Sequence, residues 1–259
     1  MAPDQPAPGG GASGNARAGA NGRGMTKAGH QAPSIWLRPE RASVGRPAQH
    51  SRAEITAVAL AMADSEGLDA VSMRRVAAEL GTGAASLYRY VETREELLDL
   101  MTDATGAEYD LPEPTGDWLA DLVEVGRQAR AIMRRHAWLA GLVITRPVIG
   151  PNGVALIEHV LTVLAPHPAG LDTKFEAFAL LNGVTATSVL HELGGGRSLQ
   201  ERHVAYLLHA AASGDRPRLA RLLAQEPQPQ ESPAPPGDPA DRYPDILARI
   251  LAGLLGKHP

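Results

Sequence analysis

The sequence contains no cysteine, few aromatic residues and no long apolar run, and each absence narrows the class of protein. Without cysteine there can be no disulfide, no thiolate zinc site and no cysteine nucleophile, which fits the reducing cytoplasm. The first residues show no basic segment followed by an apolar stretch, so no secretory signal is predicted. No stretch approaches the roughly 20 apolar residues of a membrane span, so we expect no membrane partner.

What is present suits a helical protein with an aliphatic core. Hydrophobic residues make up 44% of the 259 residues but aromatics only 4%, so Leu, Ala and Val must fill the core. Charge is unevenly distributed. Residues 1–50 hold six basic and two acidic side chains, a net of +4, whereas residues 51–105 hold five basic and ten acidic ones, a net of −5.

Residues 1–50 are predicted to be a disordered tail that ends in a basic arm. Gly, Ala and Pro dominate most of this stretch, which has too little apolar surface to offset the entropy of ordering. Met25 within it is a candidate alternative start. Ile35, Trp36 and Leu37 interrupt the composition and are candidates for docking on the folded part.

Residues 51–105 carry the signals of four short helices. Two capping boxes, Ser51–Glu54 and Thr93–Glu96, start the first and the fourth helix, and glycines end the first two. The predicted spans are 51–67, 72–81, 84–91 and 93–105. Apolar residues recur along each span at helical spacing, so we predict a compact four-helix domain.

Residues 106–259 are also predicted to be helical. The expected helices span 117–133, 136–144, 152–164, 173–193, 198–212, 215–225 and 244–255. Capping boxes at Thr173–Glu176 and Ser198–Glu201 are predicted to start two of them. Six prolines between residues 226 and 240 indicate a linker. No period-two strand pattern of any length is found, so the predicted fold class is all-α.

The segment 72–91 has the layout of a helix-turn-helix. Such a motif needs two helices held at a fixed angle by a small turn, with polar groups projecting from the second helix. Ala77, Leu80, Leu87 and Val91 are the predicted lock, and Gly81 and Gly83 permit the turn. Ser86, Tyr88, Arg89 and Tyr90 are predicted to project outward, where hydroxyl and guanidinium groups can bind phosphates or base edges. On shape alone, an ordinary helical hairpin fits equally well.

Three short motifs distinguish this segment from an ordinary helical hairpin: MRRVAAELG at 73–81, LYRYV at 87–91 and REELL at 94–98. This pattern closely resembles the N-terminal domain of TetR/AcrR-family transcriptional regulators, over about a fifth of the chain. The resemblance implies a DNA-binding regulator, most often a repressor that a small molecule releases from its operator. It implies that Tyr88 and Arg94 hold phosphates and that Ser86 and Arg74 face base edges.

The sequence also departs from that family pattern. Gly83 stands where a Ser or Thr often caps the reading helix, and Ala84 and Ala85 replace positions that often carry a base-reading side chain. The expected DNA-binding set is Arg46, Ser72, Arg74, Arg75, Ala84, Ala85, Ser86, Tyr88, Arg89, Tyr90 and Arg94. Arg46, in a Gly-Arg-Pro segment before the first helix, resembles a minor-groove arm. A flexible solubilising leader is the alternative.

The second half resembles, more loosely, the branch that contains the tetracycline repressors. That resemblance implies an effector-binding domain that forms a homodimer through the helices near 173–193 and 244–255. Paired half-sites on double-stranded DNA also favour a dimer. Effector-binding candidates are polar or aromatic groups on otherwise aliphatic helices: Trp118, Met133, His136, Trp138, Asn182, Thr185 and His191.

No catalytic, metal or cofactor site is predicted. His136 and His191 do not belong to a His-x3-His or His-Glu-x-x-His pattern, so neither is assigned to a metal. The Gly194–Gly196 run follows no strand and lacks a phosphate-loop lysine, so we interpret it as a turn. The competing functions are a helical protein-interaction adaptor and a ligand-binding enzyme.

Overall fold

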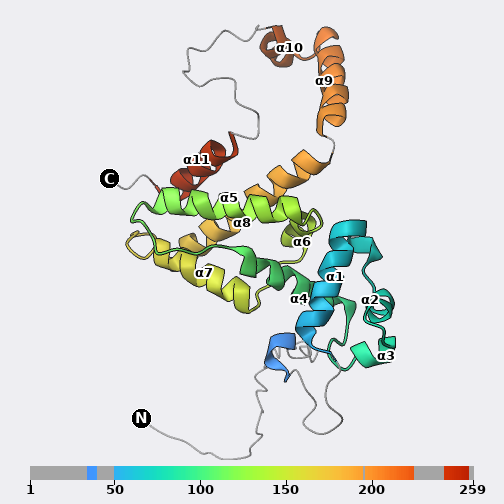
Figure 1. The fold of residues 1–259 in the computed structure, drawn as a ribbon. Helices are drawn as coiled ribbons and strands as arrows, with labels where there is room; N and C mark the ends of the chain where they lie inside the picture. The colour runs from blue at the N-terminus through green and yellow to red at the C-terminus, as the bar shows by residue number, and fades with distance from the viewer. Residues whose placement is uncertain (1–33, 40–49, 195, 225–241, 257–259) are drawn as a thin grey trace, which may run out of the picture. The chain divides into compact units, whose positions relative to one another are not determined.

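The structure, a computed structural model, describes residues 34–39, 50–194, 196–224 and 242–256, with side chains described up to 194 and again from 202. Every regular element within these ranges is helical, as predicted (Figure 1). The elements are η1 Ile35–Leu37, α1 Arg52–Glu66, η2 Leu68–Ala70, α2 Met73–Glu79, α3 Ala84–Leu87, α4 Arg94–Thr105, η3 Gly106–Glu108, α5 Trp118–Arg135, α6 Leu139–Thr145, α7 Pro151–Val163, α8 Leu171–Leu193, α9 Gly196–Ala212, α10 Pro217–Ala224 and α11 Tyr243–Leu255. The tail before residue 34 (with Met25), the segment 40–49 (with Arg46) and the 226–240 linker lie outside the described residues.

The capping box predicted at the start of α1 is present. The Glu54 amide donates to the Ser51 hydroxyl at 3.1 Å, and the Ser51 amide donates to the Glu54 carboxylate at 2.8 Å. Both bonds satisfy backbone groups that the first helical turn leaves without partners. Gly67, at φ +86°, ends the helix in a conformation that favours glycine.

The capping box predicted for α4 forms only in part. Thr93 accepts a hydrogen bond from the Glu96 amide at 3.1 Å, as expected. The Glu96 carboxylate, however, accepts from the amide of Glu92 rather than from that of Thr93. The start of α4 is therefore capped by Thr93, while Glu96 fixes the turn before it.

Two helices begin before the capping box that was predicted to start them. α8 begins at Leu171, because Gly170 is extended and its carbonyl accepts from the Lys174 amide at 3.1 Å. Thr173 therefore lies inside the first turn and is not the cap. α9 likewise begins at Gly196, ahead of the predicted start at Ser198. In both places the backbone turns into the helix before the residue that the capping pattern selected.

The first core joins helices α1–α4 to parts of α5, α6 and α8. Its buried members include Ile55, Leu87 and Leu97 from the first four helices, together with Ile132 and Val189 from the second half. Helices on both sides of residue 105 therefore bury apolar surface against each other. Such shared burial restricts how the helix-turn-helix can move independently of the rest.

The second core lies among α5, α7, α8 and α11. Leu122, Leu156, Leu181, Leu247 and Leu251 are buried within it. α11 follows the proline-rich stretch in sequence and packs on both α5 and α8 (Figure 1). The C-terminal helix is therefore an integral part of this core.

A buried hydroxyl pair fixes α11 against its neighbours. The Tyr243 hydroxyl donates to the Gly126 carbonyl at 3.0 Å and lies 2.5 Å from the Thr185 hydroxyl, which donates to the Leu181 carbonyl. A Cβ on Gly126 would press on a methyl group of Leu247 and on the Tyr243 hydroxyl, so both side chains would have to shift to admit a larger residue. The close approach of α11 to α5 thus depends on this glycine.

Helices α9 and α10 differ from the others in burial. Among their described side chains none is buried, and Val204, Tyr206, Leu208 and Leu222 are exposed. Their main helix contacts are with each other, with a few to α8. A helical pair of this kind gains little stability from its own packing.

Candidate nucleic-acid interface

Helices α2 and α3 are held together largely by the aliphatic lock that the sequence predicted. Ala77, Leu87 and Val91 are essentially inaccessible to solvent, as is Val76, whereas Leu80 is only half-buried. Gly81 turns the chain between the helices at φ +65°, a conformation that few other residues adopt. Because the lock faces inward, the opposite faces of both helices point to solvent.

Ser72 begins α2 as its N-cap. Its hydroxyl accepts a hydrogen bond from the Arg75 amide at 3.3 Å, and its backbone is extended. Gly83 occupies the equivalent position before α3 and makes no side-chain bond. The reading helix is therefore a single turn without a side-chain cap, which makes its orientation dependent on its neighbours.

The outward face of α2 and α3 carries most of the predicted DNA-binding residues. Arg74, Arg75, Ala85, Tyr88 and Arg89 are exposed, whereas Ala84 and Ser86 are half-buried. Arg89 donates to the Ser86 hydroxyl at 2.8 Å, which orients its guanidinium along the helix. Tyr88 is 50% exposed, so its ring and hydroxyl are accessible to a partner on this face.

Arg75 is paired with an acidic residue of α1. Its guanidinium donates to both carboxylate oxygens of Glu66, at 2.7 and 3.0 Å. This hydrogen bond is the main reason that the pKa of Glu66 is lowered and that of Arg75 is raised. The pair is solvent-exposed, so a phosphate can compete with Glu66 for the same guanidinium.

The prediction that Tyr90 projects outward is wrong. Tyr90 is only 7% exposed and belongs to the first core, and its hydroxyl accepts from the His50 amide at 3.5 Å. The predicted helix over 84–91 ends at Leu87, and the Tyr90 and Val91 amides both donate to the Leu87 carbonyl. Because Leu87, Tyr90 and Val91 are three and four residues apart, they share the inward face.

Arg94 makes bonds within the protein. Its guanidinium donates to the carbonyls of Val71 and Leu68, at 2.9 and 3.0 Å. These bonds tie the start of α4 to the turn that precedes α2, and the side chain is half-buried. Arg94 therefore positions two elements of the motif, a role that the sequence pattern did not indicate.

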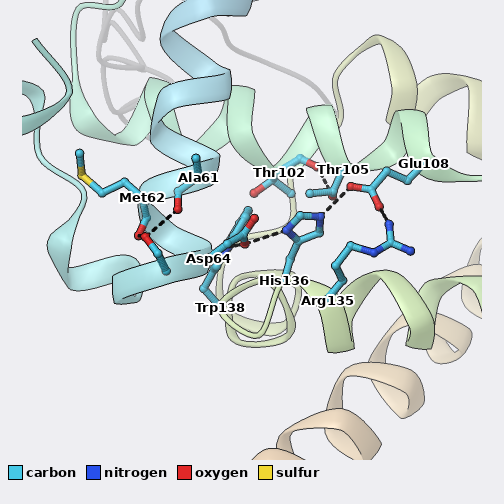
Figure 2. Close-up of polar contacts among 10 residues, drawn as sticks. Ala61, Met62, Asp64, Thr102, Thr105, Glu108, Arg135, His136 and Trp138 are labelled. Carbon is cyan, nitrogen blue, oxygen red and sulfur yellow. Dashed lines mark hydrogen bonds and ion pairs between the residues drawn. The ribbon is translucent and has the colours of Figure 1, made fainter. Parts of the chain in front are cut away.

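The effector candidates His136 and Trp138 lie at a polar joint between α1 and the α5–α6 turn. His136 Nδ1 is 2.8 Å from the Asp64 carboxylate, and its Nε2 is 2.6 Å from Glu108. Trp138 donates to the same Asp64 oxygen at 2.7 Å, and Arg135 pairs with Glu108. Figure 2 shows the imidazole ring between the two carboxylates.

Two more carboxylates of α4 bond to the second half of the chain. Asp99 accepts from the Arg146 guanidinium at 2.7 Å. Asp103 accepts from the amides of Asn152 and Gly153, at 3.3 and 3.0 Å, and so caps the first turn of α7. Part of the negative charge of residues 51–105 thus serves contacts between helices, which the charge count alone did not reveal.

The remaining effector candidates occupy different surroundings. Met133 is buried in the first core, and Thr185 is buried beside Tyr243. Trp118 packs edge-to-face on His167, with 5.1 Å between ring centroids. Asn182 donates to the Phe178 carbonyl one turn back, and His191 is exposed. His136 and Trp138 lie together, with 5.8 Å between their ring centroids, and the other five candidates have different surroundings.

In the described ranges, none of the helices has the length and apolar character that a membrane span requires. No group of three or more His, Cys, Asp or Glu side chains in the same ranges has a geometry suited to a metal ion.

A locked helix pair with outward Arg and Tyr side chains, joined through a shared core to a larger helical body, defines a helix-turn-helix regulator. Family models agree. Residues 55–101 match the bacterial regulatory proteins of the tetR family, and residues 111–257 match the tetracyclin repressor-like C-terminal domain. The chain belongs to the TetR family of effector-responsive, DNA-binding transcriptional regulators. Its family and relatives are transcriptional regulators rather than enzymes.

Individual relatives cover most of the chain. The HTH-type transcriptional repressor DrrR1 of Streptomyces coeruleorubidus is 40% identical over 232 residues, which are 85% of this chain and 83% of that protein. An HTH-type transcriptional regulator of Saccharopolyspora erythraea is 33% identical over 195 residues, 72% of this chain and 80% of that one. The Streptomyces coelicolor TetR family protein ActR, in complex with actinorhodin, is 33% identical, with a TM-score of 0.67 over 80% of this chain and 99% of ActR.

Proposed function

We propose that this regulator is a homodimeric repressor that binds a double-stranded operator and leaves it when a small molecule binds. Residues 51–105 read DNA in this proposal, and residues 106–259 bind the effector and dimerise. The observation that carries it is the outward face of α2 and α3, which presents Arg74, Tyr88 and Arg89 on the side opposite the buried Ala77, Leu87 and Val91. The 40% identity to a repressor supports the direction of regulation.

The proposed DNA contacts divide into two kinds. Arg74 and Ser86 face base edges, while Tyr88 and Arg75 contact phosphates and Arg94 acts by positioning the start of α4. Arg89, held by Ser86, is assigned to either a base edge or a neighbouring phosphate. Ala84 and Ala85 supply only apolar contact, for example with a thymine methyl group. With so few base-reading groups on α3, phosphate contacts and the fit of two half-sites carry much of the affinity.

The proposed dimer interface uses α8 and α11. α8 exposes Phe175, Leu180, Leu190 and Leu193, and α11 exposes Ile246. Large apolar side chains exposed along two neighbouring helices are typical of a protein–protein interface. A twofold dimer also matches the pairing of DNA half-sites, which lie about 34 Å apart.

A single charged substitution tests the dimer. We expect Leu180→Arg to turn the dimer into a monomer in sedimentation velocity, since an unpaired charge would be buried at the interface. Val154→Arg on α7 is the matched control, because Val154 is also an exposed aliphatic residue and lies outside α8 and α11. A wild-type protein that sediments as a monomer at micromolar concentration would contradict the dimer proposal.

The proposed effector is a small molecule bound among the helices of the second half. The ActR complex with actinorhodin supports this class of ligand. The proposed contacts with the effector are Trp118, Met133, Asn182, Thr185 and His191. For His136 and Trp138 we propose a role at the joint with α1 instead. Actinorhodin is the first probe: binding should raise the melting temperature and release bound DNA. If neither changes, this compound is not an effector of the chain.

The proposed basic arm contains Arg46. If Arg46 lies in the minor groove or on a phosphate, Arg46→Ala should make the salt dependence of DNA binding shallower by about 0.9 in log–log slope. Ala48→Gly is a control in the same segment. An unchanged slope would favour the solubilising-leader alternative. We further propose that the protein acts in the cytoplasm, where bacterial genomic DNA is found.

A further inference from the structure

The short segment Ile35–Pro39 precedes the helix-turn-helix and lies outside the family model, which begins at residue 55. It is nevertheless well anchored. Ile35 is 2% exposed and belongs to the first core, and Trp36 is half-buried, whereas Leu37 is 79% exposed. The sequence prediction that Ile35 and Trp36 dock is therefore confirmed, and that for Leu37 is wrong because η1 turns it to solvent.

The carbonyl groups of this segment are bound by Arg52, in the first turn of α1. The Arg52 guanidinium donates to the carbonyls of Ile35 and Arg38, at 2.9 and 3.0 Å. Through its Nε atom, the same guanidinium donates to the Tyr90 carbonyl at 3.0 Å. One planar group thus connects the segment to the turn that ends the reading helix.

The side chain of Arg38 extends this connection. It pairs with Glu92 and with Glu96, at 2.6 Å in the second case, and is largely buried. These two carboxylates flank the turn between α3 and α4, beside the outward face of the motif. Arg38 therefore fixes the segment to the turn after α3 and to the first turn of α4.

Trp36 reaches a different helix. A Cβ added to Gly150, the N-cap of α7, would lie 2.5 Å from the Trp36 ring and 2.4 Å from the Asp103 carboxylate carbon. Gly150 is thus enclosed by Trp36 on one side and α4 on the other. The segment contacts the turn after the reading helix through two arginines and the start of α7 through Trp36.

We propose that Ile35–Pro39 is a strap that positions the single-turn reading helix from outside the motif and connects it to the first turn of α7. α3 lacks a side-chain cap and needs external support, which Arg52, Arg38 and Ile35 provide. The elements that the segment contacts are held by hydrogen bonds of their own. At the start of α7 the Gly153 amide donates to Asp103, and in the turn before α4 the Glu92 amide donates to Glu96. The strap's residues act on DNA binding through the orientation of Tyr88 and Arg89, not by touching DNA.

The test uses the full chain and a duplex selected by the wild-type protein from random-sequence DNA, with an unrelated duplex of equal length. We expect Arg38→Ala and Trp36→Ala to weaken binding to the selected duplex about five- to tenfold. Binding to the unrelated duplex and the salt slope should not change. Trp36→Phe, which keeps a ring on Gly150, and Leu37→Ala, on the exposed side, should behave like wild type.

Amide hydrogen exchange provides a second measurement that needs no DNA. Two variants are measured: Trp36→Ala, and Arg38→Lys, which keeps the charge but loses the planar guanidinium. In both variants we expect faster amide exchange in residues 84–93 and in residues 150–154. Equal losses on both duplexes with a shallower salt slope would make Arg38 a phosphate contact and overturn the proposal. Unchanged exchange in both regions would also overturn it. The role of the strap in DNA binding rests on the proposed function of α2 and α3. If the wild-type protein selects no duplex, that proposed function fails, and the exchange measurement alone decides whether the strap positions α3.

Discussion

His136 and Asp64 are joined by a 2.8 Å contact between α5–α6 and α1, and the other nitrogen of the same ring faces Glu108 at 2.6 Å. Both partners are carboxylates, which act only as acceptors when they are ionised. The ring holds α1 against the second half of the chain, and we expect a ligand that moves α5 or α6 to act on α1 through it.

Removal of this imidazole should destabilise the protein. His136→Ala leaves Asp64 and Glu108 facing each other without the ring, and both carboxylates are about one-third exposed. Screening by solvent reduces the cost, so we expect a loss of about 1–3 kcal/mol in unfolding free energy. Chemical denaturation measures it, with the exposed Arg127→Ala on the same helix as a control. Equal stability of the two variants would argue against a structural joint.

The Arg75–Glu66 pair predicts a gain in DNA affinity. Glu66→Gln should free the Arg75 guanidinium for a phosphate and raise affinity about two- to threefold at low salt, with a steeper salt dependence. Glu124→Gln removes a charge from exposed α5 surface without such a partner and serves as the control. If Glu66→Gln instead weakens binding, Glu66 orients Arg75 productively and does not compete with DNA.

Tyr88 and Tyr90 should respond in opposite ways to truncation. Tyr90→Ala empties part of the first core and should cost about 3–5 kcal/mol of stability. Tyr88→Ala removes an exposed ring, so stability should change by less than about 0.5 kcal/mol while DNA affinity falls. Melting temperatures and fluorescence anisotropy, measured where both variants are folded, separate the two effects. A stability loss for Tyr88→Ala as large as that for Tyr90→Ala would contradict the assigned orientations.

Gly126 controls the docking of α11. Gly126→Ala should displace Leu247 and the Tyr243 hydroxyl and destabilise the protein by about 1–3 kcal/mol. Gly141→Ala on α6 meets no atom within 4 Å and should be neutral or slightly stabilising, by up to about 1 kcal/mol. Differential scanning calorimetry of the two variants makes the comparison. Similar melting temperatures would mean that α11 shifts to accommodate the methyl group without cost.

Local signals in the sequence predicted much of the fold. The capping box at Ser51, the lock around Leu87 and the exposure of Arg74 all depend on residues within a few positions of each other. The prediction that Tyr90 projects outward is wrong, although its spacing of three residues from Leu87 already places both residues on one face of a helix. Thr173 was mispredicted because the extended backbone of Gly170 let the helix begin earlier.

The polar joints could not be predicted in the same way. Asp64 and His136 are 72 residues apart, and Asp103 and Gly153 are 50 apart. Nothing in the local pattern distinguishes a carboxylate that bonds another helix from one that faces solvent. His136 and Trp138 were singled out as unusual residues on aliphatic helices, but their partners depend on how the two halves pack.

Reading of DNA by the outward face of α2 and α3 is the central claim, and the affinity ratio between a selected and an unrelated duplex tests it most directly. At one fixed salt concentration, wild type should bind the selected duplex at least about a thousandfold more tightly. Arg74→Ala should lower this affinity ratio by a factor that corresponds to about 1–3 kcal/mol. Arg127→Ala, at an exposed position on α5, should leave the ratio unchanged. Equal affinity of wild type for both duplexes, unaffected by Arg74→Ala, would contradict the account.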